Sequence, residues 1–423
     1  MNLTYNNYAI RENCIVLGTE DQCQYVAQKQ QPSTIFFDKF FYTLNCALGW
    51  PRKIIFFDRV TQLVGIPDAL SILLETISDQ PWVEGQRPAI EPNMDVVIVF
   101  DGRGEGLPKE SVHNVVEFAK LHPTIPCYYL SGAEPVPITF EYWDELKGDI
   151  TNLKLITQNS FETCNFDEAY HNYEHDFKVT KTKKFHYFVG KPRMHRYMLL
   201  ALLAERKVLD QGILSYGWGG DPQTAIETLD VMKSNKSEEY MSHFPNLLKV
   251  CQRYLPRISP VECPYSVVDS DNMANISRYM DRHDKYIYDN TWFHVSTETS
   301  NLTSTRLKDG WMLPSTIPLF YTEKTYRPML LKQVGITCGQ QGHLQGLKNK
   351  DYKPFGMWNN SEQTDMIYND EERLIAQADA ILDMCNWPDT LFKDRAMDYA
   401  NNDGLGNKNK IINSSINLMV HPH

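Results

Sequence analysis

The chain has 423 residues, a formal net charge of −11 and nine scattered cysteines without a CxxC pair. This length predicts two domains, the acidic balance excludes a global attraction to nucleic acid, and the odd number of cysteines argues against a disulfide framework. Because we find no apolar signal segment at the N-terminus and no run of about 18 apolar residues, we expect a cytoplasmic protein without a membrane span.

The first part of the chain alternates strand patterns with helical patterns. Apolar runs that end in polar or glycine turns predict strands at 14–19, 53–60, 94–104, 125–135 and 153–163. Apolar residues at helical spacing predict helices at 67–79 and 109–122. This alternation indicates a parallel α/β sheet, which we assign to a first domain of residues 1–180.

A second alternating series follows a polar, lysine-containing stretch. Strands are predicted at 185–190, 212–218, 292–299, 319–324 and 335–339. Helices are predicted at 195–209, 326–334 and 372–385. We assign this series to a second domain of residues 181–385. Residues 386–423 are predicted to be a polar tail, with a loop at 401–410.

Three acidic residues follow predicted strands of the first domain. Asp101 and Glu105 lie in VFDGRGEG (99–106), whose GxGxG spacing and late following helix argue against a dinucleotide-binding turn. Glu134 follows the strand at 125–135. Since ligands in open α/β sheets bind at the carboxyl ends of strands, each is a candidate general base, with a solvated turn acid as the alternative. Asp101 is favoured because it leaves the strongest predicted strand directly.

The sequence HNYEH (171–175) matches H-x-x-E-H, in which two histidines one helical turn apart can bind zinc. The match is short, it lies in the polar stretch between the domains, and no third ligand is evident. We therefore interpret it as a coincidence and expect no metal.

The first helix of the second domain begins with cations. Arg193, His195 and Arg196 surround its predicted N-terminus, where positive charge is unfavourable unless an anion compensates it. An arginine fork matches phosphate oxygens well. A solvated basic helix start is the alternative.

Further along the second domain, a strand ends at Glu298, and Glu323 and Lys324 lie just before another predicted helix. An acid beside a base at a helix N-terminus suits a phosphorylated ligand. The plainer interpretation is an N-cap, Thr322, followed by a first-turn glutamate. Together with Arg196, these residues predict a site in which carboxylates accept bonds from sugar hydroxyls and cations hold a diphosphate.

The order HRYMLLALL, VSTETS and YTEKTYRPMLLKQVGITCG resembles the donor-binding half of α-1,3-fucosyltransferases and related bacterial and viral glycosyltransferases, over about residues 185–385. The resemblance implies a GT-B fold, two Rossmann-like domains facing each other across a cleft, with the acceptor bound by the first domain. It implies Arg196 for the diphosphate, Glu323 for the ribose or sugar, Lys324 for phosphate and Glu298 near the sugar. GITCG lacks the family's proline and STET replaces its E-N-S/T, which leaves the donor sugar open.

These observations predict an inverting glycosyltransferase that uses a UDP- or GDP-sugar without a tightly bound cofactor or metal. The acceptor is expected to be a glycan or a hydroxymethylated base of viral DNA, and in a viral protein the location would be the host cytoplasm. The alternatives are a non-catalytic nucleotide-sugar or glycan-binding protein and a zinc-dependent hydrolase using HNYEH.

Overall fold

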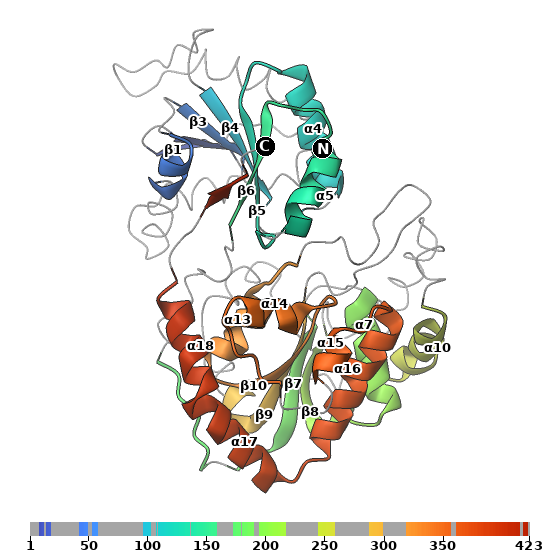
Figure 1. Ribbon diagram of the computed structural model, residues 1–423. Coiled ribbons are helices and arrows are strands. Elements are labelled where there is room, and N and C mark those ends of the chain that lie inside the picture. The colour runs from blue at the N-terminus through green and yellow to red at the C-terminus, as the bar shows by residue number, and fades with distance from the viewer. Residues whose placement is uncertain are drawn as a thin grey trace. The chain divides into compact units, whose positions relative to one another are not determined.

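The structure is a computed structural model. It describes residues 8–11, 14–17, 42–49, 53–57, 96–102, 107, 109–135, 137–158, 172–178, 180–189, 194–216, 244–258, 287–298, 319–356, 361–414 and 418–421. The chain divides into two compact units: unit 1 comprises 1–165 with 415–423, and unit 2 comprises 166–414. Each unit contains its own sheet with helices beside it (Figure 1), so the predicted α/β class is confirmed.

This division differs from the predicted limits at residues 180 and 385. The segment before residue 180 belongs to unit 2, where Tyr173 is buried and donates to the Asp289 carboxylate at 2.8 Å. The predicted tail is shared between the units. Helices α17 (Asp389–Asn401) and α18 (Asp403–Ile412) belong to unit 2, whereas β11 (Met419–Val420) joins the sheet of unit 1.

The loop predicted at 401–410 is therefore wrong, because most of it forms α18. Its residues have weak helix propensity, but Gly404, Asn407, Lys408 and Ile411 are buried in the unit. The Asn407 amide donates to the Lys353 carbonyl at 2.8 Å, and its oxygen accepts from the Lys353 N–H at 2.9 Å. Tertiary contacts of this kind override local propensity.

The sheet of unit 1 has the order β1-β2-β3-β4-β5-β6-β11. The strands are β1 (Tyr8–Arg11), β2 (Cys14–Leu17), β3 (Lys53–Phe57), β4 (Val96–Gly102), β5 (Cys127–Ser131) and β6 (Leu153–Thr157). β2 to β6 are parallel neighbours in chain order, and β1 and β11 add antiparallel edges. The predicted strands of this half are confirmed, and the described parallel strands show no reversal of order.

Helices cover this sheet and bury apolar side chains on both of its faces. α4 (Lys109–Leu121), predicted at 109–122, and α5 (Pro137–Lys147), which was not predicted, pack side by side (Figure 1). Phe118 of α4 packs edge-on against Phe100 of β4, and Trp143 of α5 packs against Tyr129 of β5. The other face carries Ile54, Phe56, Val97, Val99, Leu130 and Ile156 around Leu44. The helix predicted at 67–79 lies outside the described residues.

The sheet of unit 2 is parallel throughout, with the order β10-β9-β7-β8. Its strands are β7 (Lys183–Val189), β8 (Gly212–Tyr216), β9 (Thr291–Thr297) and β10 (Val334–Cys338). These correspond to predicted strands. The strand predicted at 319–324 is wrong: Leu319 to Thr322 are irregular, and α13 (Glu323–Leu330) begins directly after them.

The two faces of this sheet differ in polarity. One face presents Phe185, Tyr187, Phe293, Val295, Ile336 and Cys338 to a large apolar core. Helices α7 (Met194–Glu205), α10 (Pro245–Tyr254), α16 (Asp370–Cys385) and α17 contribute to that core. The opposite face carries His186 of β7, His294 and Ser296 of β9, and Thr337 of β10. Helix α13 packs on β9 and β10, and α18 packs on α13.

Within the described ranges, no helix is long and apolar enough to cross a membrane.

Candidate functional site

The strand order of unit 2 indicates where a ligand is expected. β8 follows β7 in the chain and pairs with one side of it, whereas β9 pairs with the other side, so the order reverses between β7 and β9. Ligands of open parallel sheets bind outside the carboxyl ends of the strands at such a reversal. Here β7 leads into α7, and β9 leads into Glu298.

The N-terminal turn of α7 carries cations beside this reversal. The His195 ring donates from Nε2 to the Glu298 carbonyl at 2.9 Å, which fixes α7 to the end of β9. Arg196 is buried, and its carbonyl accepts from the Tyr187 hydroxyl at 3.1 Å. The first turn of α7 contains no acidic residue. Arg193 lies outside the described residues.

Glu298 is fully buried and holds the start of α13. Its carboxylate accepts from the Thr322 N–H at 3.0 Å, from the Thr322 hydroxyl at 2.5 Å and from the Thr325 hydroxyl. The N-terminal end of a helix carries partial positive charge, so a carboxylate that accepts several short hydrogen bonds there stabilises the helix. Glu298 therefore positions α13 at the carboxyl end of β9.

The same network continues to His343 in helix α14 (His343–Asn349). Thr325 donates its hydroxyl proton to Glu298, so it accepts from His343, whose Nε2 lies 3.1 Å from the Thr325 oxygen. His343 is thus the Nε2–H tautomer. Burial lowers its pKa, and the charges of Glu298 and Asp365 partly offset this effect. Gly339 leaves room for it, because a Cβ there would lie 2.5 Å from the ring.

Lys324 lies in the first turn of α13. Thr322 is the N-cap, as the plainer interpretation of this stretch predicted, and its hydroxyl accepts from the Lys324 N–H at 3.3 Å. The Lys324 ammonium lies 3.4 Å from the same oxygen, and the Ser296 hydroxyl donates to the Lys324 carbonyl at 3.4 Å. Glu323 is the first residue of the helix. The structure thus places Arg196, Glu298, Glu323 and Lys324 on elements that follow β7 and β9.

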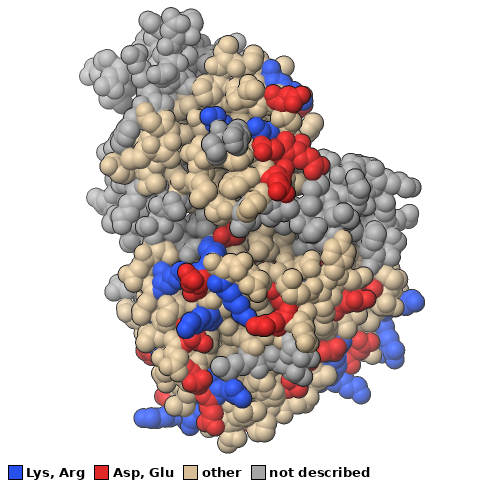
Figure 2. Space-filling model, in the orientation of Figure 1, with Lys and Arg blue, Asp and Glu red and all other residues tan. Residues whose placement is uncertain are grey.

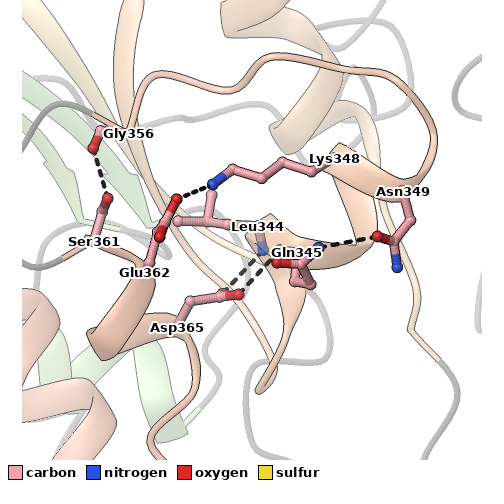
Figure 3. A network of polar contacts seen from close by, with 8 residues as sticks. All are labelled: Leu344, Gln345, Lys348, Asn349, Gly356, Ser361, Glu362 and Asp365. Atoms are coloured by element: carbon pink, nitrogen blue, oxygen red, sulfur yellow. Dashed lines mark hydrogen bonds and ion pairs between the residues drawn. The ribbon is translucent and has the colours of Figure 1, made fainter.

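Three helices of unit 2, namely α10, α13 and α14, have N-termini capped by carboxylates from neighbouring elements. Asp365 of α15 (Ser361–Asp365) accepts from the N–H groups of Leu344 and Gln345 at 2.9 and 3.1 Å, as Figure 3 shows. Glu371 accepts from Asn246 and Leu247 at the start of α10. α13 uses Glu298. The first turn of α7 carries basic side chains and no acidic one, which suits an anion at this helix N-terminus.

Unit 1 gathers polar residues at the carboxyl edge of its own sheet. Asp101 lies near the end of β4 and Glu134 lies after β5; both are buried. Ser131 pairs in register with Gly102 and with Thr157, so β4, β5 and β6 end side by side. Gly102 is required there, since a Cβ would overlap the Tyr129 hydroxyl at 2.1 Å. Glu105 lies outside the described residues.

The described part of HNYEH is engaged in packing. Tyr173 bonds Asp289 and lies 3.2 Å from His175 Nδ1, and Glu174 pairs with Lys332 and Lys408. His171 lies outside the described residues. Among the residues that the structure describes, no group of three or more His, Cys, Asp or Glu side chains could hold a metal ion.

Sequence reasoning missed Thr325, His343 and Asp365. The first had a local signal, because Thr322 and Thr325 are one helical turn apart and face the same way. His343 and Asp365 had none, since their roles depend on α14 and α15 packing beside α13.

Comparisons of the chain with models of protein families, with curated proteins and with solved structures give no match. The resemblance to the fucosyltransferase family remains a prediction from the motifs.

Proposed function

We propose that the protein is an inverting glycosyltransferase of the GT-B type that transfers a sugar from a nucleoside diphosphate donor bound by unit 2. The observation that supports this most is the strand reversal in unit 2, where Arg196 and Lys324 follow β7 and β9 and a buried Glu298 fixes their helices. Cations anchored at helix N-termini suit a diphosphate.

In the proposed reaction a carboxylate of unit 1 removes the proton of an acceptor hydroxyl. The hydroxyl oxygen forms a bond to the anomeric carbon, and the bond from that carbon to the diphosphate oxygen breaks. Arg196 and Lys324 stabilise the negative charge that develops on the departing diphosphate. Asp101 and Glu134 are the described candidates for the base, and both are buried at the carboxyl edge of their sheet.

The acceptor that we favour is a glycan hydroxyl rather than a DNA base. The sequence KVTKTKK (178–184) precedes and begins β7, at the amino edge of the sheet. Its residues Lys181, Lys183 and Lys184 donate to backbone carbonyls of the unit. On the face shown in Figure 2, basic and acidic side chains are interspersed. A phosphate backbone needs a continuous basic track, which these placements do not favour.

Calorimetry with UDP and GDP tests the donor site directly. Lys324→Ala should weaken binding of the preferred diphosphate by about 1.5–3 kcal/mol, the range for a hydrogen bond to a charged group. Lys353→Ala is the matched control, because that side chain is 72% exposed and pairs with Asp403. An unchanged affinity in Lys324→Ala would remove Lys324 from the site and contradict the proposal.

Turnover assays separate the remaining candidates. Transfer to an oligosaccharide supports the glycan acceptor, and transfer to a duplex that carries hydroxymethylated cytosine supports the DNA base. Nucleotide-sugar binding without any transfer would indicate a binding protein. Zinc bound at one ion per chain, with hydrolytic activity, would indicate the hydrolase.

A further inference from the structure

A small cavity lies at the opposite edge of the unit 2 sheet from the proposed donor site. It has room for about one water-sized group and is partly open to solvent. It is lined where β9 and β10 begin, by Thr291, Trp292, Gln333 and Val334, with Lys332 from the turn after α13. His175, Lys181 and Ala396 complete much of the wall.

Gln333 is the unusual group in this wall. The residue is 2% exposed, and within the described part of the chain neither its amide nitrogen nor its amide oxygen has a hydrogen-bond partner. Its backbone N–H is satisfied by the Pro328 carbonyl at 2.8 Å, so only the side chain lacks partners. Leaving a buried polar group unsatisfied costs about 1–3 kcal/mol. Such a group in a native fold therefore points to a water or an ion that fills the cavity.

The charges around the cavity favour an anion over a water. The buried lysines Lys181 and Lys332 line it, and Lys408 lies 3.6 Å from Glu174, which also pairs with Lys332. Glu174, the partner of Lys332, has a side chain that is 67% exposed, and Asp289 accepts from Tyr173. Among the described residues that line the cavity, two are lysines and none is an aspartate or a glutamate. Buried positive charge beside a cavity is stabilised by a negative charge in it.

We propose that this cavity is a binding site for a small monovalent inorganic anion, held by the Gln333 amide N–H and by the ammonium groups of Lys181 and Lys332. Chloride and hydrogen carbonate share this charge, and both are small. The inference is independent of the proposed transferase activity, since the cavity lies at the amino edge of the sheet and the donor site at its carboxyl edge.

The test is thermal unfolding of the full chain in potassium chloride, potassium hydrogen carbonate and potassium gluconate at equal ionic strength and pH. Gluconate is too large to enter and serves as the reference. An anion at about twenty times its dissociation constant should raise the unfolding midpoint by about 2–5 °C relative to gluconate. A response to chloride or to hydrogen carbonate alone identifies which anion binds.

Three variants make the result specific to the cavity. Gln333→Leu should abolish the response, and Gln333→Glu should abolish it while keeping the midpoint high without anions, because its carboxylate supplies the charge. Gln377→Leu is the control, since Gln377 is a buried glutamine of α16 outside the cavity wall, and it should respond like the wild type. Equal midpoints in all three salts, or a full response in Gln333→Glu, would overturn the proposal in favour of a bound water.

Discussion

Units 1 and 2 are both α/β structures with parallel central strands, but they place their polar residues differently. In unit 1 the described central strands bury apolar side chains on both faces, and the polar groups Asp101, Ser131 and Glu134 are found at the carboxyl edge. In unit 2 one face is apolar, whereas the other buries His186, His294 and Ser296, and α13 packs on β9 and β10.

This difference indicates in which unit the candidate site is coupled to the buried interior. A polar row inside a fold is stable only if its groups are hydrogen-bonded. In unit 2 the row is tied to α13 at Ser296, whose hydroxyl donates to the carbonyl of Lys324, so the geometry of the site is coupled to the interior. The candidate base in unit 1 lies at the end of an apolar sheet. Replacing it is therefore expected to change activity without changing the stability of the unit.

The largest expected effect is on catalysis and concerns unit 1. Asp101→Asn should lower the turnover number by at least about 100-fold, because a general base contributes about 10²–10⁴-fold. The affinity for the nucleotide-sugar should not change, since the donor is assigned to unit 2. Steady-state kinetics and calorimetry measure the two quantities. Full activity in Asp101→Asn with a loss in Glu134→Gln would transfer the role to Glu134.

Removing the Glu298 carboxylate, which holds the start of α13, should destabilise unit 2. Glu298→Ala leaves the Thr322 N–H and the hydroxyls of Thr322 and Thr325 without their acceptor, which should cost about 3 kcal/mol in urea unfolding. The matched change in unit 1 is Thr157→Val, because the buried Thr157 hydroxyl has no hydrogen-bond partner and its loss should be neutral or stabilising. Similar losses in both variants would refute the contrast between the units.

Acid should weaken unit 2 before unit 1. Burial, with the charges of Arg327 and Lys324, lowers the pKa of His294 to about 3, and burial also lowers the pKa values of His186 and His343. Below a pH of about 6.5 these histidines bind protons in the unfolded chain but not in the folded unit. The free energy of unfolding therefore falls as the pH drops from about 6.5 toward 3.

Each such histidine contributes up to about 1.4 kcal/mol per pH unit in this window. Hydrogen-exchange mass spectrometry in urea at pH 7 and pH 5 resolves peptides of each unit. An equal loss of protection in units 1 and 2 would show that the buried histidines do not dominate.

The smallest expected effects lie in the network of Figure 3. Asp365→Ala removes the cap of α14 and should cost about 1 kcal/mol. Glu362→Ala breaks only the exposed pair with Lys348, where the Glu362 side chain is 76% exposed, and should change stability by less than about 0.5 kcal/mol. Urea midpoints of the two variants should therefore differ clearly, and equal midpoints would assign no capping role to Asp365.

The sequence alone determined much of the local structure. Short apolar runs ending in polar turns predicted β2 to β10, because a buried parallel strand is apolar along its length and ends where a polar turn begins. Thr322 before Glu323 and Lys324 predicted a helix N-terminus, since a threonine oxygen satisfies the first free N–H groups. Such signals lie within a few residues of one another and need no distant partner.

Only the tertiary structure decided which distant groups meet. The reversal between β7 and β9, the capture of Thr322 and Thr325 by Glu298, and the link from Thr325 to His343 join residues far apart in the chain. The helical state of α18 and the unsatisfied amide of Gln333 likewise depend on neighbours from other elements. Sequence patterns report periodicity and local capping, whereas strand order and the satisfaction of buried polar groups are properties of the whole packed unit.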